Sequence, residues 1–244
     1  MRYKCIVSYD GTEFNGWQLQ KGYRSVQQEI QQAISKIANQ PIKIVGAGRT
    51  DSHVHAVGQC FHFDLDKQYK DIRKAINSQL PKDIYIREVE IVDESFHSRF
   101  SAFYKHYDYL VNDGPYSPLL RNYCYQIHDR LDEELMRKAT KILEGTHDFT
   151  SFNATSISEI ENQVRTIYKI DIERRDNMVR LSFYGDGFLR YMVRILSRCL
   201  IEVGLQNLSL EQLQKMLLAK NKQVCSYNCA AEGLYLIEVS YLPY

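Results

Sequence analysis

The chain has 244 residues and a formal net charge of +1, from 31 Lys and Arg residues against 30 Asp and Glu residues. Hydrophobic residues make up 44% and charged residues 25%, which is the composition of an ordinary globular protein. This even balance excludes an argument for a nucleic-acid partner from bulk charge, so local patches would have to carry it.

The sequence also lacks the signals of a membrane or secreted protein. No run approaches the ~18 apolar residues that a membrane helix requires. Residues 1–7 alternate like a strand and contain no apolar signal-peptide core, so a cytoplasmic location is expected. Six cysteines scattered over the chain do not form a disulfide framework, and free thiols are expected.

The first hundred residues alternate between strand and helix patterns. In chain order they predict a strand over residues 1–7, a helix over 25–38, strands over 41–45 and 58–64, a helix over 71–80 and a strand over 84–92. For the first helix, Ser25 is the expected N-cap, and Gln28 is placed to complete a capping box.

The second part of the chain partly repeats this order. It predicts a strand over 102–111, a helix over 131–143, a strand pair over 164–173 and 178–184, helices over 187–203 and 208–219, and a strand over 234–241. Asp176-Asn177 is the expected turn of the strand pair. The order is typical of an α+β fold, with antiparallel or mixed sheets and helices packed on one side.

A glycine-containing loop after an apolar run is the most informative segment. It reads Gly46-Ala47-Gly48-Arg49-Thr50-Asp51-Ser52-His53-Val54-His55-Ala56. Asp51 is either a turn residue that bonds its own backbone or an ionised nucleophile or base, and spacing alone leaves both open. The nearby Arg49 favours the ionised carboxylate, because a positive charge stabilises the charged form.

The histidines behind this loop suggest a second interpretation. His53 and His55 stand two residues apart, and a metal site there would need a third ligand such as Asp51 or His62. Histidines that support the loop are the favoured alternative. A half-site at Cys225 and Cys229 lacks a second pair of ligands, so no metal is expected.

Two further patterns could serve an RNA partner. Three arginines recur every four residues, at Arg190, Arg194 and Arg198. They could form a solvated basic stripe or bind an anion. The segment Phe103-Tyr104-Lys105-His106-Tyr107-Asp108-Tyr109 interleaves aromatic and basic residues. Stacking on an unpaired base needs this mixture, although an ordinary amphipathic strand would also have it.

Taken together, the motifs resemble those of the tRNA pseudouridine synthase A family. The likeness runs through nearly the whole chain, in order and with the expected spacing. The matching segments are Tyr9-Asp10-Gly11-Thr12, Gly16-Trp17-Gln18-Leu19-Gln20, Ser25-Val26-Gln27, Gly48-Arg49-Thr50-Asp51, Val54-His55-Ala56, Phe96-His97-Ser98-Arg99-Phe100-Ser101-Ala102, Asp148-Phe149-Thr150-Ser151-Phe152, Met192-Val193-Arg194 and Glu232-Gly233-Leu234.

The resemblance implies an activity and a set of residue roles. The family isomerises uridine to pseudouridine in the anticodon stem-loop of tRNA, at positions 38 to 40, without a metal or a cofactor. By position, Asp51 would be the nucleophile and Arg194 its ion-pair partner. Tyr107 would stack on the target uracil, and Arg49 would help to place the loop or the flipped nucleotide.

The resemblance also implies an architecture. The family fold consists of two α/β halves that share one mostly antiparallel sheet, with helices packed on it and a basic cleft between the halves. Here residues 1–100 would form the N-terminal half with the catalytic loop, and residues 101–244 the C-terminal half. Family members are homodimers, and one tRNA contacts both subunits.

Three positions depart from the family pattern. His53 stands where the family usually has glycine, Ile195 where it often has asparagine, and Arg198 where it often has glycine. Glycine at the first position suggests a backbone conformation that side chains adopt with difficulty, although histidine tolerates it better than β-branched residues do. Two alternatives therefore stay open: a relative that modifies another RNA, and a non-catalytic RNA-binding relative.

Overall fold

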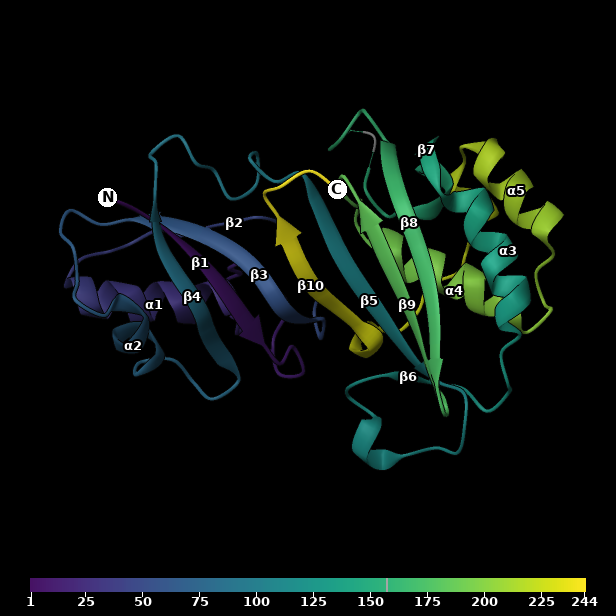
Figure 1. Cartoon of the computed structure of the whole chain (residues 1–244), viewed down its shortest axis with the longest axis horizontal. Coiled ribbons are helices and arrows are strands. Elements are labelled where there is room, and N and C mark those ends of the chain that lie inside the picture. Colours follow the sequence, from purple (N-terminus) through teal and green to yellow (C-terminus); the bar gives the residue numbers. More distant parts are fainter. Residues whose placement is uncertain (157) are drawn as a thin grey trace. The chain divides into compact units, whose positions relative to one another are not determined.

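The protein is described by a computed structural model that covers residues 1–156 and 158–244 (Figure 1). It contains two compact units. The first consists of Met1–Phe103 and Tyr235–Pro243, and the second of Tyr104–Leu234 and Tyr244. The sequence places the division between residues 100 and 101 and assigns the closing strand to the second half, whereas residues 235–243 belong to the first unit.

The first unit is a sheet with two helices. Its strands are β1 (Arg2–Tyr9), β2 (Val45–Gly46), β3 (His55–Asp64), β4 (Ile84–Val92) and β10 (Leu234–Ser240), and its helices are α1 (Val26–Ala38) and α2 (Ile72–Asn77). The order is β4-β1-β3-β10, with β1 antiparallel to both β3 and β4, while β10 runs parallel to β3 and β2 pairs with β3. In Figure 1, α1 and α2 lie behind these strands.

The alternation of β1 explains the core of this unit. Tyr3, Cys5, Val7 and Tyr9 are buried, and the residues between them are more exposed. Helix α1 buries the apolar stripe predicted from its periodicity. The predicted capping box is wrong, however: Ser25 is the N-cap residue, but its side chain makes no capping hydrogen bond, and its hydroxyl is buried without a partner among the described residues.

The second unit also combines strands with helices. Its strands are β5 (Tyr104–Asn112), β6 (Tyr125–Gln126), β7 (Gly145–Asp148), β8 (Val164–Arg175) and β9 (Met178–Gly185); its helices are α3 (Glu133–Leu143), α4 (Met192–Gly204) and α5 (Leu210–Ala219), with short 3-10 turns η1 (Pro118–Leu120), η2 (Thr150–Phe152), η3 (Lys222–Val224) and η4 (Ala231–Gly233). The order β5-β9-β8-β7 is antiparallel throughout. The α+β class with mostly antiparallel strands and packed helices is therefore confirmed.

Three predicted boundaries need correction. The helix expected from residue 187 begins at Met192, because Tyr191 has a left-handed backbone (φ 62°) that an α-helix cannot include. The strand expected over 41–45 shrinks to Val45–Gly46, and the strand expected from residue 58 begins at His55. Strands β6 and β7 escaped prediction because two and four residues are too short for a periodic signal.

The cysteines and the helices agree with two other expectations. All six cysteines are free thiols, and all but Cys225 are buried. The Sγ atoms of Cys199 and Cys225 are 3.9 Å apart; their hydrogen bond lowers the pKa of Cys225 and, together with burial, raises that of Cys199. Within the described residues, no helix is long and apolar enough to cross a membrane.

A buried ion pair joins the residue after β5 to strand β8. The side chain of Asp113 is fully buried and accepts two hydrogen bonds of 2.8 Å from the Arg174 guanidinium. It also accepts the backbone N–H of Leu131 at 3.0 Å. Burial alone would raise the pKa of Asp113, but the bonds from Arg174 and Leu131 outweigh it, and the pKa lies below its ordinary value of 3.8.

We expect Asp113→Asn to lower the free energy of unfolding by about 3 kcal/mol, because it neutralises the buried carboxylate and leaves the largely buried Arg174 guanidinium with Glu133 as its one charged partner among the described residues. Asp171→Asn, which breaks an exposed pair with Lys169, is the matched control and should cost less than about 1 kcal/mol. Urea unfolding of both variants measures the difference, and equal losses would contradict the assignment. Since the pKa of Asp113 is lowered by folding, its stabilisation is present above pH 3.8 and is lost as the pH falls through the folded-state pKa.

Candidate functional site

The loop that carries Asp51 leaves the sheet of the first unit between β2 and β3. At its glycine end, the N–H of Ala47 donates to the carbonyl of Cys60 at 2.8 Å. The side-chain amide of Gln59 donates to the carbonyl of Gly48 at 3.1 Å. The first part of the loop is therefore fixed to β3.

The backbone on both sides of Asp51 is also held. Thr50 is buried, and its hydroxyl lies 2.7 Å from the hydroxyl of Tyr9. Its carbonyl accepts the N–H of Trp17 at 3.1 Å. After Asp51 the chain turns, and the N–H of Val54 donates to the Asp51 carbonyl at 3.2 Å. Asp51 thus stands on a short turn whose two ends cannot move independently of the sheet.

Gly16 explains why the N-terminal motifs accompany this loop. Its φ is +82°, and a Cβ atom there would lie 2.5 Å from the carbonyl oxygen of Thr50, so a side chain is excluded by both space and conformation. The Gly16 carbonyl accepts the N–H of Val26, and the Trp17 carbonyl accepts that of Gln27. The segments around residues 16–20 and 25–27 therefore form one support behind the loop.

His53 has the left-handed backbone that the usual glycine predicts, with φ 65°. Two bonds hold it there. Its N–H donates to the Phe14 carbonyl at 3.1 Å, and its Nδ1 lies 2.8 Å from the Thr12 carbonyl oxygen. The histidine keeps the turn and adds a side-chain tie that glycine would lack.

The other two histidines support the strands around the loop. His55 is buried, accepts the N–H of Gly11 at Nδ1 (3.0 Å) and stacks on Tyr235 with ring centroids 4.6 Å apart. Nδ1 of His62 accepts the N–H of Ser98 at 3.2 Å, and burial lowers the pKa of His62 to about 4. Across residues 1–156 and 158–244, no three His, Cys, Asp or Glu side chains are grouped to hold a metal ion.

Arg49 lies at the surface of the loop. Its side chain is exposed. A guanidinium that is exposed beside the loop can meet an external anion such as a phosphate.

Tyr107 belongs to strand β5 of the second unit and is buried, with its ring edge-on to Phe188 at a centroid distance of 5.3 Å. Its neighbour Tyr109 donates from its hydroxyl to the Ala230 carbonyl at 2.8 Å. Gly233 packs so closely on Tyr109 that a Cβ atom would lie 2.7 Å from the ring. This contact explains why glycine is required at the centre of the Glu232-Gly233-Leu234 motif.

Arg194 sits in the first turn of α4. Its Nε–H donates to the Cys229 carbonyl at 2.8 Å, and the backbone N–H of Cys229 donates to the Arg194 carbonyl at 3.3 Å. The guanidinium carbon lies 4.9 Å from the centroid of the Tyr191 ring. These contacts hold the guanidinium from two directions, through its Nε–H and across the Tyr191 ring.

The other two arginines of the stripe have different surroundings. Arg190 is exposed and lies over Tyr191. Arg198 pairs with Glu202 one turn along the helix at 2.5 Å and contacts the Tyr125 hydroxyl. Arg198 therefore differs from Arg190 and Arg194, which both contact the Tyr191 ring.

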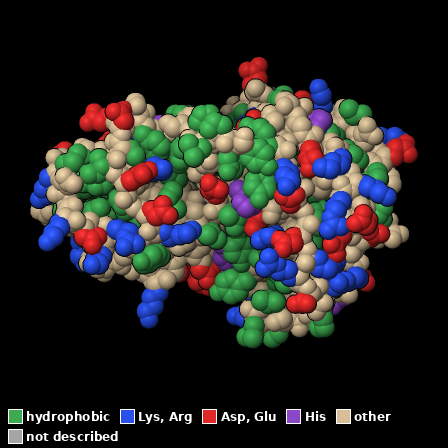
Figure 2. Space-filling view, viewed as in Figure 1, with side chains coloured by type: hydrophobic (Ala, Val, Ile, Leu, Met, Phe, Trp, Pro, Cys, Tyr) green, Lys and Arg blue, Asp and Glu red, His purple; other side chains and the backbone are tan. Residues whose placement is uncertain are grey.

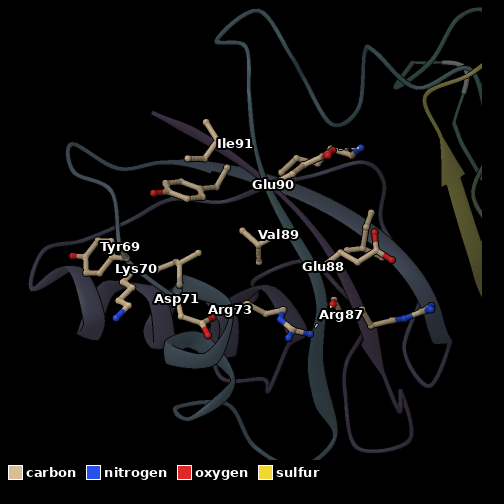
Figure 3. A pocket seen from close by; sticks show the side chains of 13 residues that line it. Tyr69, Lys70, Asp71, Arg73, Arg87, Glu88, Val89, Glu90 and Ile91 are labelled. Atoms are coloured by element: carbon tan, nitrogen blue, oxygen red, sulfur yellow. Dashed lines mark hydrogen bonds and ion pairs between the residues drawn. The ribbon is translucent and has the colours of Figure 1, made fainter.

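A pocket lies elsewhere in the first unit. It runs along β4 beside α2, is lined by residues that include Lys70, Arg73 and Arg87, and shares no residue with the loop (Figure 3). Its charges are mostly satisfied locally, as in the 2.6 Å pair between Lys4 and Glu90. On the face drawn in Figure 2, basic and acidic side chains are interspersed.

Sequence patterns did not predict several residues that hold the Asp51 turn and the Arg194 side chain in place. Tyr9 and Thr50 belong to matching motifs, but their mutual hydrogen bond joins segments 41 positions apart. Tyr191 and Cys229 support Arg194 only because a loop after α5 folds back on α4. The one available signal for Tyr191 was its place directly before Met192-Val193-Arg194.

The chain is similar in sequence to known proteins. A family model described as "tRNA pseudouridine synthase" matches residues 5–101 and 139–242, segments that contain Asp51 and Arg194 but not Tyr107. The chain is 43% identical to the tRNA pseudouridine synthase A of Geobacillus sp. (strain WCH70), over 98% of both chains. It is 41% identical to that of Bacillus subtilis (strain 168), over 99% of both.

A solved structure titled "Crystal Structure of a Cbf5-Nop10-Gar1 Complex" is similar at 14% identity over 82% of this chain and 53% of the other. Its TM-score of 0.34 is too low to support any argument. The family match and the full-length relatives are decisive: this chain belongs to the tRNA pseudouridine synthase family.

Proposed function

We propose that the protein isomerises uridine to pseudouridine in the anticodon stem-loop of tRNA, with Asp51 as the nucleophile. The observation that carries this proposal is the turn at Asp51, which is tied to Tyr9, Trp17 and β3. A turn fixed on both sides presents one carboxylate in a constant direction, as covalent catalysis needs. The family match and the relatives named tRNA pseudouridine synthase A support the activity and the substrate class.

The reaction is balanced within one nucleotide. The Asp51 carboxylate adds to the sugar or the uracil, and the N-glycosidic bond breaks with its electron pair on the base. The uracil rotates and its C5 bonds to C1′ of the ribose. The carboxylate is then released, C5 loses its proton and N1 gains one. Nothing is oxidised or reduced, so this scheme needs no redox co-reactant.

The other roles follow from what this chemistry requires. The carboxylate adds only when ionised, and an arginine beside it favours that form, which is the role proposed for Arg194. The uracil must leave the stack, and an aromatic face such as Tyr107 recovers part of that cost. The exposed Arg49 is suited to a phosphate of the flipped nucleotide. The homodimer, the cytoplasmic location and the basic cleft stay predictions.

His53 bears on the non-catalytic alternative. If histidine had distorted the turn, its backbone would have left the left-handed region that glycine favours. It has φ 65° and two hydrogen bonds, which supports an intact loop.

We expect Asp51→Asn to abolish tritium release from tRNA labelled at uracil C5, because the amide cannot act as the nucleophile, while tRNA binding persists. Asp66→Asn, at an exposed carboxylate of the same unit, is the control and should retain full activity. Normal turnover by the Asp51 variant would remove this residue from the mechanism.

Tyr107→Phe should lower kcat much less than Tyr107→Ala, because Phe keeps the aromatic face and Ala removes stacking worth about 1–3 kcal/mol per base. Steady-state kinetics of both variants on the same tRNA make the comparison. Equal losses would show that the hydroxyl, not the ring face, matters.

His53→Gly should leave kcat within about three-fold of the unmodified protein, since glycine adopts the same backbone while losing one side-chain bond. His53→Val should lower kcat more, because a β-branched residue resists a positive φ. A larger loss with Gly than with Val would show that the imidazole itself takes part in the reaction.

A further inference from the structure

Tyr191 breaks two local rules at the start of α4. It has φ 62° and ψ 0°, a left-handed conformation that bulky side chains rarely adopt. It also occupies the N-cap position, where Ser, Thr, Asn or Asp would accept a backbone N–H, and its side chain makes no such bond. Residues held in unfavourable conformations tend to occur where function requires them.

The surrounding backbone forces this conformation. The N–H of Arg190 donates to the Thr155 hydroxyl at 3.0 Å, and its carbonyl accepts the N–H of Ala154 at 2.9 Å. On the other side, the N–H of Met192 donates to the Leu189 carbonyl at 3.0 Å. The chain is thus held both before and after Tyr191, and the direction of its ring is set by the fold.

The ring meets two guanidinium groups. The guanidinium carbons (Cζ) of Arg190 and Arg194 each lie 4.9 Å from the centroid of the Tyr191 ring, within the range of cation–π contacts. Arg190 also donates to the Tyr191 hydroxyl at 3.3 Å. Arg194 is held from a second direction by the Cys229 carbonyl. A long side chain held at its Nε and across its planar end has little freedom left.

We propose that Tyr191 is a positioning residue for the isomerisation: its ring holds the Arg194 guanidinium in the one orientation that serves the nucleophile. This inference rests on the proposed function, in which Arg194 pairs with Asp51. Arg194 touches the reacting group, and Tyr191 acts through it. Preorganisation of this kind matters because a shift of about 1 Å in a catalytic group can cost about 100-fold in rate.

Substitutions at Tyr191 separate the ring from the backbone. Tyr191→Phe keeps the ring and loses only the hydroxyl. Tyr191→Asn removes the ring but suits a left-handed backbone. Tyr191→Leu removes the ring and keeps a bulky side chain under the same backbone constraint. The pair formed by Tyr125 and Arg198 offers a matched control, because Tyr125→Leu removes a similar contact from an arginine that pairs with Glu202 instead.

The experiment measures kcat and KM for tRNA by tritium release, with folding checked by circular dichroism and thermal unfolding. We expect Tyr191→Asn and Tyr191→Leu to lower kcat about 10-fold while KM stays within about two-fold, as for a group misplaced in the reacting complex. Tyr191→Phe and Tyr125→Leu should stay within about two-fold of the unmodified protein. Should the Asn variant fail to fold, the Leu variant gives the same comparison.

Three results would overturn the inference. They are an unchanged kcat in the folded ring-deleting variants, equal losses in Tyr191→Phe and Tyr191→Leu, and a rise in KM with kcat intact, which would assign the ring to RNA contact. Arg194→Gln, which removes the positive charge, is measured alongside and tests the proposed function separately. If that variant is fully active, the role of Arg194 fails; if it is impaired while Tyr191→Leu is not, only the inference about Tyr191 fails.

Discussion

The close approach of Gly16 to the carbonyl of Thr50 is the constraint on which the first unit's site depends. With no side chain at residue 16, the segment from Tyr9 to Trp17 lies directly against the turn that carries Asp51. The hydrogen bonds of Trp17, Phe14 and the His53 imidazole all require this close approach of the segment to the turn. Any side chain at Gly16 would push the support from the turn, and the carboxylate would lose its fixed direction.

In the second unit, Arg194 is held in place in a different way. Instead of a tight backbone approach, it uses a delayed helix start. Because α4 begins at Met192 rather than at residue 187, the five residues before it do not follow a helical path, and Tyr191 places an aromatic ring beside the first helical turn. Arg194 is then held by that ring and by the carbonyl of Cys229.

The sequence predicted the elements with strong periodicity and the motif residues, and it failed where long-range contacts decide. Strand β4 and the hairpin at Asp176 follow from local alternation and turn chemistry. The same local rules wrongly assigned a capping box to Ser25, whose buried hydroxyl is enclosed by tertiary packing. Ser209 and Gln212 form a real capping box, because there the helix end is exposed and local bonding prevails.

The unequal environments of the six thiols have a practical consequence for labelling. Thiolates, not thiols, react with maleimides and similar reagents. Burial raises the pKa of Cys60 and Cys124 to about 11 and that of Cys229 to about 12, and Cys5 and Cys199 are raised as well. Cys225 is half-buried and has a lowered pKa. A fluorophore would therefore attach first at Cys225, in the loop that leads back to Arg194, without any engineered cysteine.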